Sequence, residues 1–272
     1  MGHTRITDAD DSRMDLFRHL RGSERRFLRP PPLGAREVPC FVVEGGRVIA
    51  RALGAGYVPL AIAVDARCVT DLPWIENAGT EVFVAEHALL QRITGLGVIR
   101  EAVGIFARPA EREARELLAR SQRVLVLEGV VNPMNLGVII RSAAALGVDA
   151  TLCDPTSSDP LYRRAVRGSM GAVLTHPWAR IEPLPGSLDV VRAAGFRIFA
   201  LVADRFAEPV GTALAAASPP VALVLGGEGH GISPGVLAGV DAQVTVPMSS
   251  GVDSLNVGAA AAVACYLLGA AS

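Results

Sequence analysis

The chain has 272 residues, half of them hydrophobic, with a mean hydropathy of +0.37 and a formal net charge of −1 at pH 7. This length allows two domains with sizeable cores, and a pI near 6.5 excludes a protein that binds nucleic acid through a strongly basic overall charge. The sequence contains no lysine, so all 26 basic residues are arginines. Each cation therefore carries a planar guanidinium, which suits phosphate recognition.

The sequence also argues against a membrane, secreted or metal-binding protein. The apolar stretch 257–271 is shorter than the roughly 20 residues that cross a bilayer, and the N-terminus has no apolar signal region. The cysteines form no CxxC pair and no cluster with histidine; they are Cys40, Cys68, Cys153 and Cys265. We expect a cytoplasmic protein with reduced thiols, no metal and no membrane contact.

The first predicted element is an arginine-rich helix that starts near residue 13 and ends at the prolines from residue 30 onward. Four arginines recur in it at a spacing of three or four residues, which a helix places on one face; they are Arg18, Arg21, Arg25 and Arg29. Two interpretations stay open for this row. It is either a solvated helix face or a set of side chains that binds a polyanion.

Residues 13–108 are predicted to form a small α/β domain, because short apolar runs alternate with helical patterns. The expected strands lie at 40–45, 60–65, 81–86 and 102–109, and the expected helices at 46–56 and 86–95. A charged, helix-prone segment at 109–122 is predicted to be a linker helix.

Residues 123–272 are predicted to form a second, larger α/β domain. The expected strands lie at 123–128, 150–154, 172–176, 196–202, 221–226 and 242–247, and the main helices at 135–147 and 256–270. Continuous apolar strands of this kind indicate a mainly parallel sheet that is covered on both faces. Ligands of such sheets bind at the loops beyond the carboxyl ends of the strands.

The first notable loop follows the strand at 123–128. It contains Asn132 and Asn135, and the helix after it carries Arg141. Turn chemistry and helix capping explain the asparagines as well as a ligand site does. A cation directed inward from an otherwise apolar helix needs a partner, so Arg141 is the stronger candidate for a functional residue.

The second loop, 226–231, is rich in glycine, which lets a backbone approach a ligand closely. It does not match the dinucleotide pattern GxGxxG, because a match from Gly227 requires glycine where Ile232 stands. We expect His230 to be a solvent-exposed loop residue.

The third loop, 248–254, leads into the most apolar helix of the chain. Ser254 and Asn256 stand at the entrance of that helix. Capping explains one of these two polar residues, so the pair indicates hydrogen-bonding groups held on a rigid support.

Three segments, in this order and spacing, resemble the motifs of the SpoU (TrmH-like) RNA 2′-O-ribose methyltransferases of the SPOUT class; they are residues 132–147, 223–233 and 246–268. The resemblance spans 123–268. Residues 41–56 more weakly resemble the substrate-binding domain of that family, which is similar to a ribosomal RNA-binding protein.

The resemblance implies a C-terminal α/β domain with a trefoil knot, which binds S-adenosylmethionine. It also implies an obligate homodimer with active sites at the interface. The reaction would transfer a methyl group to a ribose 2′-hydroxyl of RNA, and ribosomal RNA is favoured over tRNA as the substrate.

The site residues divide into three groups. The implied catalytic residues are Asn135, Arg141, Glu228, Ser254 and Asn256. The implied cofactor-binding residues are Leu225, Gly226, Gly227, Val246, Met248 and Leu255. The candidate RNA-binding residues are Arg18, Arg21, Arg25, Arg29 and Arg167. Arg167 belongs to a stretch with Arg163 and Arg164 that is equally consistent with an ordinary helix surface.

Two interpretations of Arg141 remain. It is the base that removes the hydroxyl proton, or it positions the hydroxyl and stabilises the developing alkoxide; the second is favoured because a guanidinium normally stays protonated. Two other functions fit the sequence less well: an RNA-binding module without catalysis, and a nucleotide-dependent oxidoreductase. The first would be expected to lose the catalytic set, and the second lacks a glycine fingerprint.

Overall fold

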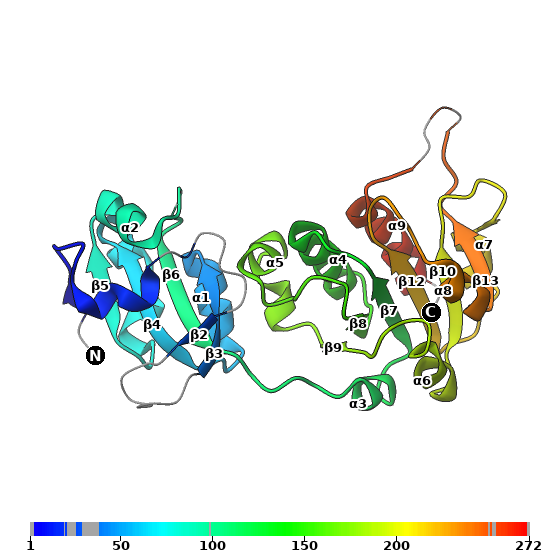
Figure 1. The fold of residues 1–272 in the computed structure, drawn as a ribbon, viewed down its shortest axis with the longest axis horizontal. Helices are drawn as coiled ribbons and strands as arrows, with labels where there is room; N and C mark the ends of the chain where they lie inside the picture. The colour runs from blue at the N-terminus through cyan, green and yellow to red at the C-terminus, as the bar shows by residue number, and fades with distance from the viewer. Residues whose placement is uncertain are drawn as a thin grey trace. The chain divides into compact units, whose positions relative to one another are not determined.

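The computed structural model describes residues 3–18, 20, 26–28, 38–97, 99–249, 251 and 254–270, without the side chains of 26–28 and 270. The chain forms two compact units (Figure 1). The first consists of Met1–Ala110 and Leu161–Arg167, and the second of Glu111–Pro160 and Gly168–Ser272. Within the described residues, no helix is long and apolar enough to cross a membrane.

The first unit is built on a six-stranded mixed sheet with the order β1-β5-β4-β6-β3-β2. Its strands are β1 (Thr4–Arg5), β2 (Arg26–Leu28), β3 (Val38–Glu44), β4 (Pro59–Asp65), β5 (Val82–Ala85) and β6 (Ala102–Ala107). The pairs β1–β5 and β4–β5 are parallel, and the other three are antiparallel. The four strands predicted for this part of the chain are therefore confirmed.

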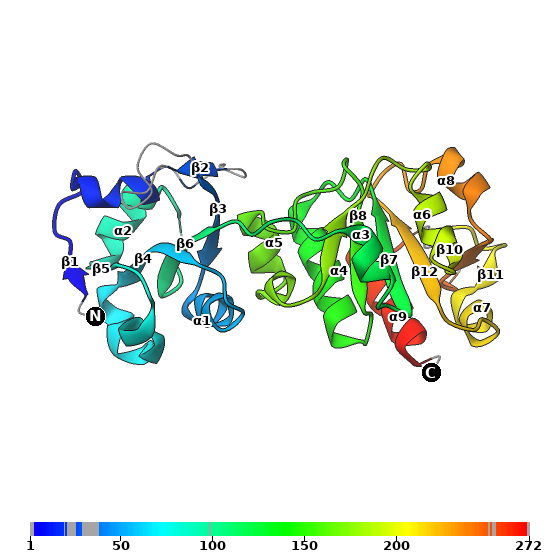
Figure 2. The same ribbon diagram turned by 90° about the horizontal axis from the view of Figure 1, so that it is seen from below.

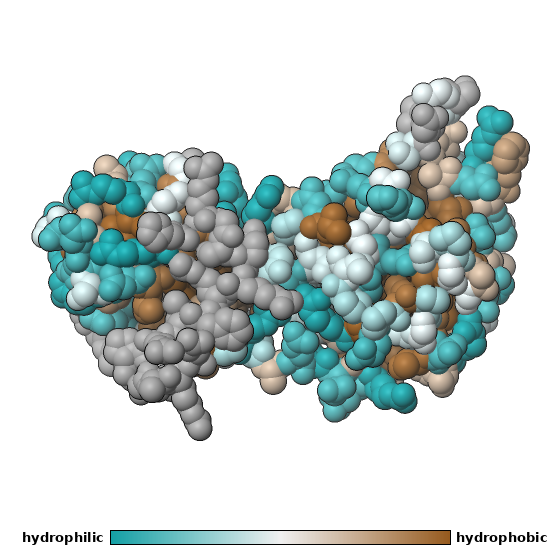
Figure 3. All heavy atoms as spheres, in the orientation of Figure 1, coloured by the Kyte–Doolittle hydropathy of each residue, from teal (hydrophilic) through white to brown (hydrophobic). Residues whose placement is uncertain are grey.

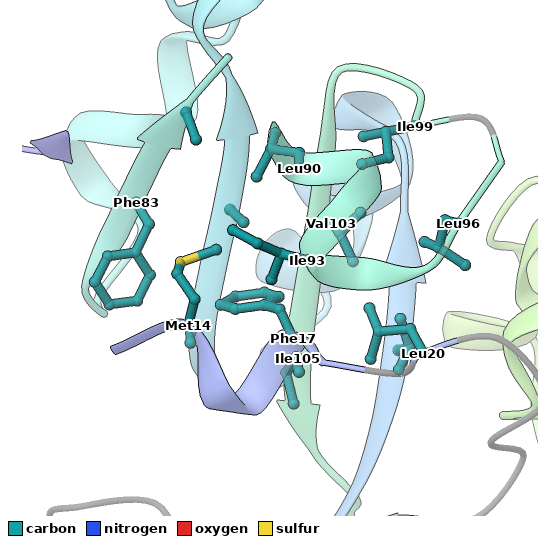
Figure 4. Close-up of a cluster of buried hydrophobic side chains, with 14 of the residues drawn as sticks. Met14, Phe17, Leu20, Phe83, Leu90, Ile93, Leu96, Ile99, Val103 and Ile105 are labelled. Atoms are coloured by element: carbon teal, nitrogen blue, oxygen red, sulfur yellow. The ribbon is translucent and has the colours of Figure 1, made fainter. Parts of the chain in front are cut away.

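Short helices complete the first unit. They are α1 (Gly46–Gly54), α2 (His87–Thr94) and the 3₁₀ segments η1 (Ser12–Phe17), η3 (Ala66–Asp71) and η4 (Pro73–Asn77). Figure 4 shows how Met14 and Phe17 of η1 point into the apolar cluster beside Ile93 of α2. Phe17 meets Phe83 of β5 edge to face, with ring centroids 6.2 Å apart. The segment that precedes the first long strand is thus part of this core.

The predicted arginine-rich helix is wrong as a single element. The 3₁₀ turn η1 ends at Phe17, and Arg26–Leu28 is a strand that pairs antiparallel with β3. This pairing satisfies the backbone of β3 on the side away from β6, which a helix cannot do. Arg18 forms an ion pair with Asp15 at 2.8 Å. Arg21, Arg25 and Arg29 lie outside the described residues.

The second unit contains a seven-stranded sheet with the order β11-β13-β10-β12-β7-β8-β9, and every neighbouring pair is parallel. The strands are β7 (Arg123–Glu128), β8 (Ala150–Cys153), β9 (Trp178–Arg180), β10 (Arg197–Leu201), β11 (Glu208–Pro209), β12 (Val221–Gly226) and β13 (Ala242–Thr245). The predicted parallel sheet is confirmed. The central strands β7 and β12 are buried over most of their length, as their continuous apolar sequences require.

Helices cover both faces of this sheet (Figure 2). The helices are α3 (Ala114–Leu118), α4 (Pro133–Ala145), α6 (Leu188–Ala193), α7 (Val210–Ala215), α8 (Pro234–Gly239) and α9 (Val257–Ala270). Helices α3, α6 and α8 share one apolar cluster with the sheet. On the other face α4 and α9 pack along each other, and α7 contacts α9. The terminal apolar stretch is therefore a packed helix, as predicted.

Two sequence predictions fail in this part of the chain. Residues 172–176 were predicted as a strand, but Ala172–Leu174 is a 3₁₀ turn (η5), and the strand follows as β9. The reason is the turn before it, where Met170 and Gly171 both have positive φ. The linker helix predicted over 109–122 is reduced to α3, whose Leu118 is buried in the core of the second unit.

Candidate active site

A cavity of about 560 Å³ opens at the carboxyl ends of β10, β12 and β13 in the second unit. Three chain segments line it: Leu201–Ala203, Leu225–Ile232, and residues from Thr245 to Ala260. The cavity thus lies where ligands bind in parallel α/β sheets. All six predicted cofactor-binding residues line it, namely Leu225, Gly226, Gly227, Val246, Met248 and Leu255.

The carboxylate of Glu228 connects the glycine-rich loop to the start of α4 and to the start of α9. Glu228 accepts hydrogen bonds from the side-chain amides of Asn135 and Asn256, both at 2.7 Å and both on Oε1. The amide of Asn256 also lies 3.3 Å from Oδ1 of Asn135. Three of the five predicted catalytic residues therefore form one network. We call Asn135, Glu228 and Asn256 the amide–carboxylate network.

Helix capping accounts for two other asparagine contacts. Asn132 caps α4, because its Oδ1 accepts from the backbone N–H of Met134 at 3.0 Å. Asn256 has both roles, since its Oδ1 accepts from the backbone N–H of Gly258 at 2.9 Å while its amide donates to Glu228. The capping interpretation thus holds for Asn132, whereas Asn135 belongs to the network. Ser254 is exposed and lines the cavity.

The glycines of the second loop are needed because two backbones cross with no space between them. A Cβ on Gly227 would stand 1.8 Å from the carbonyl oxygen of Gly129, and a Cβ on Gly226 would stand 2.3 Å from the carbonyl carbon of Gly231. Gly229 and Gly231 have positive φ, which glycine adopts without strain. The sequence predicted a close backbone approach, and here the approaching group is another part of the chain.

A second carboxylate, which sequence reasoning missed, fixes the end of the glycine-rich loop. Glu128, the last residue of β7, accepts hydrogen bonds from the Ser233 hydroxyl at 2.7 Å and from the Ser233 backbone N–H at 2.9 Å. Ser233 in turn caps α8. The Ser-Pro pair at 233–234 was the available signal, because it is typical of a helix start.

Arg141 does not join the amide–carboxylate network. Its side chain is exposed on α4 and forms no hydrogen bond or ion pair with any residue that the structure describes. The expectation that this cation points inward is wrong, because α4 turns its apolar residues Ile139 and Ile140 into the core and leaves position 141 outside. A guanidinium without a protein partner remains available to a ligand.

Arg167, the remaining predicted RNA-binding residue, lies on α5 (Arg163–Gly168). Its Nη1 is 3.7 Å from Oε2 of the buried Glu44, and Arg163 forms a shorter ion pair with Oε1 of the same carboxylate. Arg163 is thus mainly occupied by a protein partner, while Arg167 stays partly exposed. Among the residues described, no group of three histidine, cysteine or acidic side chains is placed to hold a metal.

Comparison with known proteins identifies the class. The model of the SpoU rRNA methylase family matches residues 122–266. An uncharacterized tRNA/rRNA methyltransferase of Mycobacterium tuberculosis is 37% identical over 96% of this chain and 90% of its own length. A 23S rRNA (guanosine(2553)-2′-O)-methyltransferase of Bacillus subtilis is 27% identical over 84% of this chain and 88% of its own length.

Solved structures show the same fold. The crystal structure of an rRNA methyltransferase from Sinorhizobium meliloti superposes with a TM-score of 0.77 at 23% identity, covering 97% of this chain and 96% of that one. The SpoU methyltransferase AviRb from Streptomyces viridochromogenes, in complex with AdoMet, gives 0.72 at 25% identity over 85% and 89%.

The fold and the matched segments together define an α/β RNA methyltransferase. The chain belongs to the SpoU rRNA methylase family. The family and the enzyme class predicted from the three motif segments are confirmed.

Proposed function

We propose that the protein transfers a methyl group from S-adenosylmethionine to a ribose 2′-hydroxyl of ribosomal RNA. The observation that carries this is the amide–carboxylate network at the mouth of a glycine-lined cavity. The network places one negative charge and two oriented amides beside the cavity. The Bacillus subtilis relative, named for 2′-O-methylation of 23S rRNA, favours ribosomal RNA over tRNA.

The residues present fit S-adenosylmethionine. The cavity volume of about 560 Å³ lies within the range of about 300–1,000 Å³ that is usual for small-molecule sites. Thr245 lines it with a buried hydroxyl that has no hydrogen-bond partner among the described residues, as expected for a group that a ligand satisfies. The backbone of Leu225, Gly226, Val246 and Leu255 would hold the ligand. S-adenosylmethionine supplies an electrophilic methyl group on a sulfonium.

Glu228 and the two asparagines prepare the site for a cation and a ribose. The carboxylate is held by two amides at 2.7 Å, so its charge is fixed beside the cavity and needs no rearrangement during reaction. A negative charge in this place favours a cationic sulfonium over a neutral ligand. The Ser254 hydroxyl lines the same cavity and would orient the reacting 2′-hydroxyl.

Arg141 acts by charge and position in this proposal. Its guanidinium is exposed and has no partner among the described residues, so it is free to grip a phosphate of the RNA with two parallel hydrogen bonds. In that place it also stabilises the alkoxide that develops on the attacking oxygen, and the hydroxyl proton passes to solvent water. Removal of the proton by Arg141 itself is the alternative.

A homodimer is part of the proposal. The helices α4 and α9 pack together and leave apolar side chains exposed: Val138 is 38% exposed, Val263 is 40% exposed and Tyr266 is 62% exposed. A second copy of the chain would bury this surface and bring Arg141 of α4 to the interface. Light scattering at micromolar concentration tests this, because an active monomer would contradict it.

A trefoil knot in the second unit is also proposed. Its support is the crossing of Gly227 against Gly129 and the tight packing of α9 on α4, where a Cβ on Gly269 would lie 2.2 Å from the carbonyl oxygen of Leu146. Residues 13–108 would serve as the RNA-binding domain, joined through 109–122 to the methyltransferase domain at 123–272. We place the reaction in the cytoplasm, where the four free cysteines stay reduced.

The test uses purified protein and labelled methyl donor. S-adenosylhomocysteine is expected to bind in calorimetry, whereas NAD is not. Label from S-adenosylmethionine is expected in in-vitro-transcribed 23S rRNA and, after digestion, in a 2′-O-methylated nucleoside. Label in tRNA alone would show that tRNA and not ribosomal RNA is the substrate. Label on a base would overturn the proposed transfer to a ribose hydroxyl.

A further inference from the structure

The loop between β10 and β11 connects the cavity to an exposed aromatic side chain. Leu201, Val202 and Ala203 line the cavity, and three residues further on Phe206 is 82% exposed. Figure 1 shows this loop beside the chain segment that follows β13, and Val246 and Met248 of that segment line the same cavity. A large apolar ring therefore stands in water three residues along the chain from the cavity lining.

The loop holds this ring in a defined place. Oδ1 of Asp204 accepts a hydrogen bond from the backbone N–H of Phe206 at 2.9 Å, and the backbone carbonyl of Asp204 accepts one from Ala207 at 3.1 Å. These two bonds make a local turn of the kind that aspartate favours. Phe206 is thus presented by an ordered turn, although no apolar core covers it.

A cation accompanies the ring. The guanidinium of Arg205 lies over the ring of Phe206 at 4.8 Å from the centroid. Arg205 forms no ion pair with any residue in the described part of the chain. In Figure 3, hydrophilic and hydrophobic side chains stand next to each other on this projecting part of the second unit. One face of the ring carries a cation, and the rest of the ring is open to solvent.

We propose that Phe206 and Arg205 form a stacking platform for a nucleobase of the RNA substrate near the methylated nucleotide. An aromatic ring beside an arginine is the combination by which proteins hold unpaired bases and the phosphates between them. Aromatic and arginine side chains are also enriched at protein–protein interfaces, so an interface with a second copy of the chain is the alternative that the test below distinguishes. The inference rests on the proposed RNA methyl transfer.

The test compares Phe206→Ala and Phe206→Trp with wild type, using in-vitro-transcribed 23S rRNA as the probe. Base stacking of about 1–3 kcal/mol corresponds to RNA binding that is roughly 5- to 150-fold weaker in Phe206→Ala. Phe206→Trp is expected to bind as wild type and to show fluorescence quenching when RNA is added. The native Trp74 and Trp178 give the background signal in the wild-type protein. Met170→Ala, which changes an exposed apolar residue of the second unit outside the cavity, is the matched control.

Each other outcome overturns the proposal. Unchanged RNA binding in Phe206→Ala, or no added quenching in Phe206→Trp, means that no base stacks on this ring. Weaker S-adenosylhomocysteine binding assigns the ring to the cofactor, and a smaller mass by light scattering assigns it to a second copy. If wild type itself methylates no RNA, the proposed function fails instead. The two failures are therefore distinguishable.

Discussion

Asn135 and Asn256 stand 121 residues apart in the sequence, yet their side-chain amides meet on the same carboxylate oxygen of Glu228, each at 2.7 Å. The start of α4, the glycine-rich loop and the start of α9 are thereby tied together at one atom. Hydrogen bonds to an ionised acceptor are roughly twice as strong as those between neutral groups. The position of Ser254 and Leu255, which lead into Asn256, depends on this connection.

Glu228→Gln tests the connection. The glutamine removes the charge, while its side-chain carbonyl oxygen can still accept from both amides, so the hydrogen bonds become weaker and the site loses its negative charge. We expect methyl transfer to RNA to fall about 10- to 100-fold, while the thermal midpoint changes little because Glu228 is exposed. Steady-state rates with saturating donor measure this. Glu182→Gln, another exposed glutamate, is the control and should keep full activity; equal losses in both variants would refute the role.

Gly227→Ala should damage the fold at the cavity. Its Cβ would stand 1.8 Å from the carbonyl oxygen of Gly129, so one of two backbones must move. Overpacking of this kind costs about 1–3 kcal/mol of unfolding free energy, and S-adenosylhomocysteine binding should weaken with it. Urea unfolding and calorimetry measure the two effects. Gly54→Ala at the end of α1, where nothing lies within 4 Å of the new Cβ, should be neutral or slightly stabilising.

Acid should destabilise the second unit through His176. Burial lowers the pKa of this histidine from 6.5 to about 4, and its Nε2 lies 2.9 Å from the hydroxyl of Thr151. The unfolded chain therefore binds a proton between these pH values while the folded chain does not. The stabilisation is complete above pH 6.5 and is lost as the pH falls towards 4, by roughly 3 kcal/mol.

The measurement for His176 is the unfolding free energy in urea at pH 7, 6 and 5. His176→Gln keeps a hydrogen-bonding side chain but cannot titrate, so its curve should be flatter than that of wild type. Parallel curves for the two proteins would show that another group causes the loss.

The second unit should fold without the first, provided that α3 is kept. Leu118 of α3 is buried among side chains of the second unit, so a fragment of residues 111–272 should be more stable than one of residues 121–272. Loss of a buried leucine side chain costs about 2–5 kcal/mol. The longer fragment should bind S-adenosylhomocysteine and methylate RNA poorly. RNA turnover equal to that of the full chain would show that the first unit does not recognise the substrate.

Sequence patterns predicted the elements whose signal is local. The apolar runs of β7 and β12 and the apolar helix α9 were found because each must be buried on several sides. The strand expected at 172–176 was wrong because a short apolar run is compatible with a strand and with a 3₁₀ turn such as Ala172–Leu174. The positive φ of Met170, a non-glycine residue, left no signal in the sequence.

The sequence names candidate residues for the site but not the connections between them. Asn135, Glu228 and Asn256 were named from the motif resemblance, whereas the shared oxygen follows only from the crossing of distant loops. The contact of Glu128 with Ser233 was missed for the same reason, because the two residues are 105 positions apart. The helix predicted for the arginine-rich segment was wrong because the spacing of the arginines does not reveal the open edge of β3. Residues Arg26–Leu28 pair with that edge as a strand.

Arg141→Lys separates the two interpretations of Arg141. Lysine keeps a positive charge but loses the planar fork that binds a phosphate through two hydrogen bonds. If Arg141 positions the RNA and stabilises the alkoxide, the rate of the lysine variant should fall by orders of magnitude at every pH. The reason is that a guanidinium with two parallel hydrogen bonds stabilises the transition state by a few kcal/mol more than an ammonium does. S-adenosylhomocysteine affinity should hardly change, since Arg141 is not among the residues that line the cavity.

The opposite behaviour is expected if Arg141 accepts the proton. A lysine ammonium loses its proton more readily than a guanidinium does, so the lysine variant would be the easier base. Its rate would then rise with pH more steeply than that of wild type and would approach the wild-type rate in alkaline buffer. Rates of both proteins from about pH 7 to about pH 10, with saturating donor, decide between these outcomes. Because Arg141 has no partner within the described chain, neither profile is complicated by an ion pair that the substitution would break.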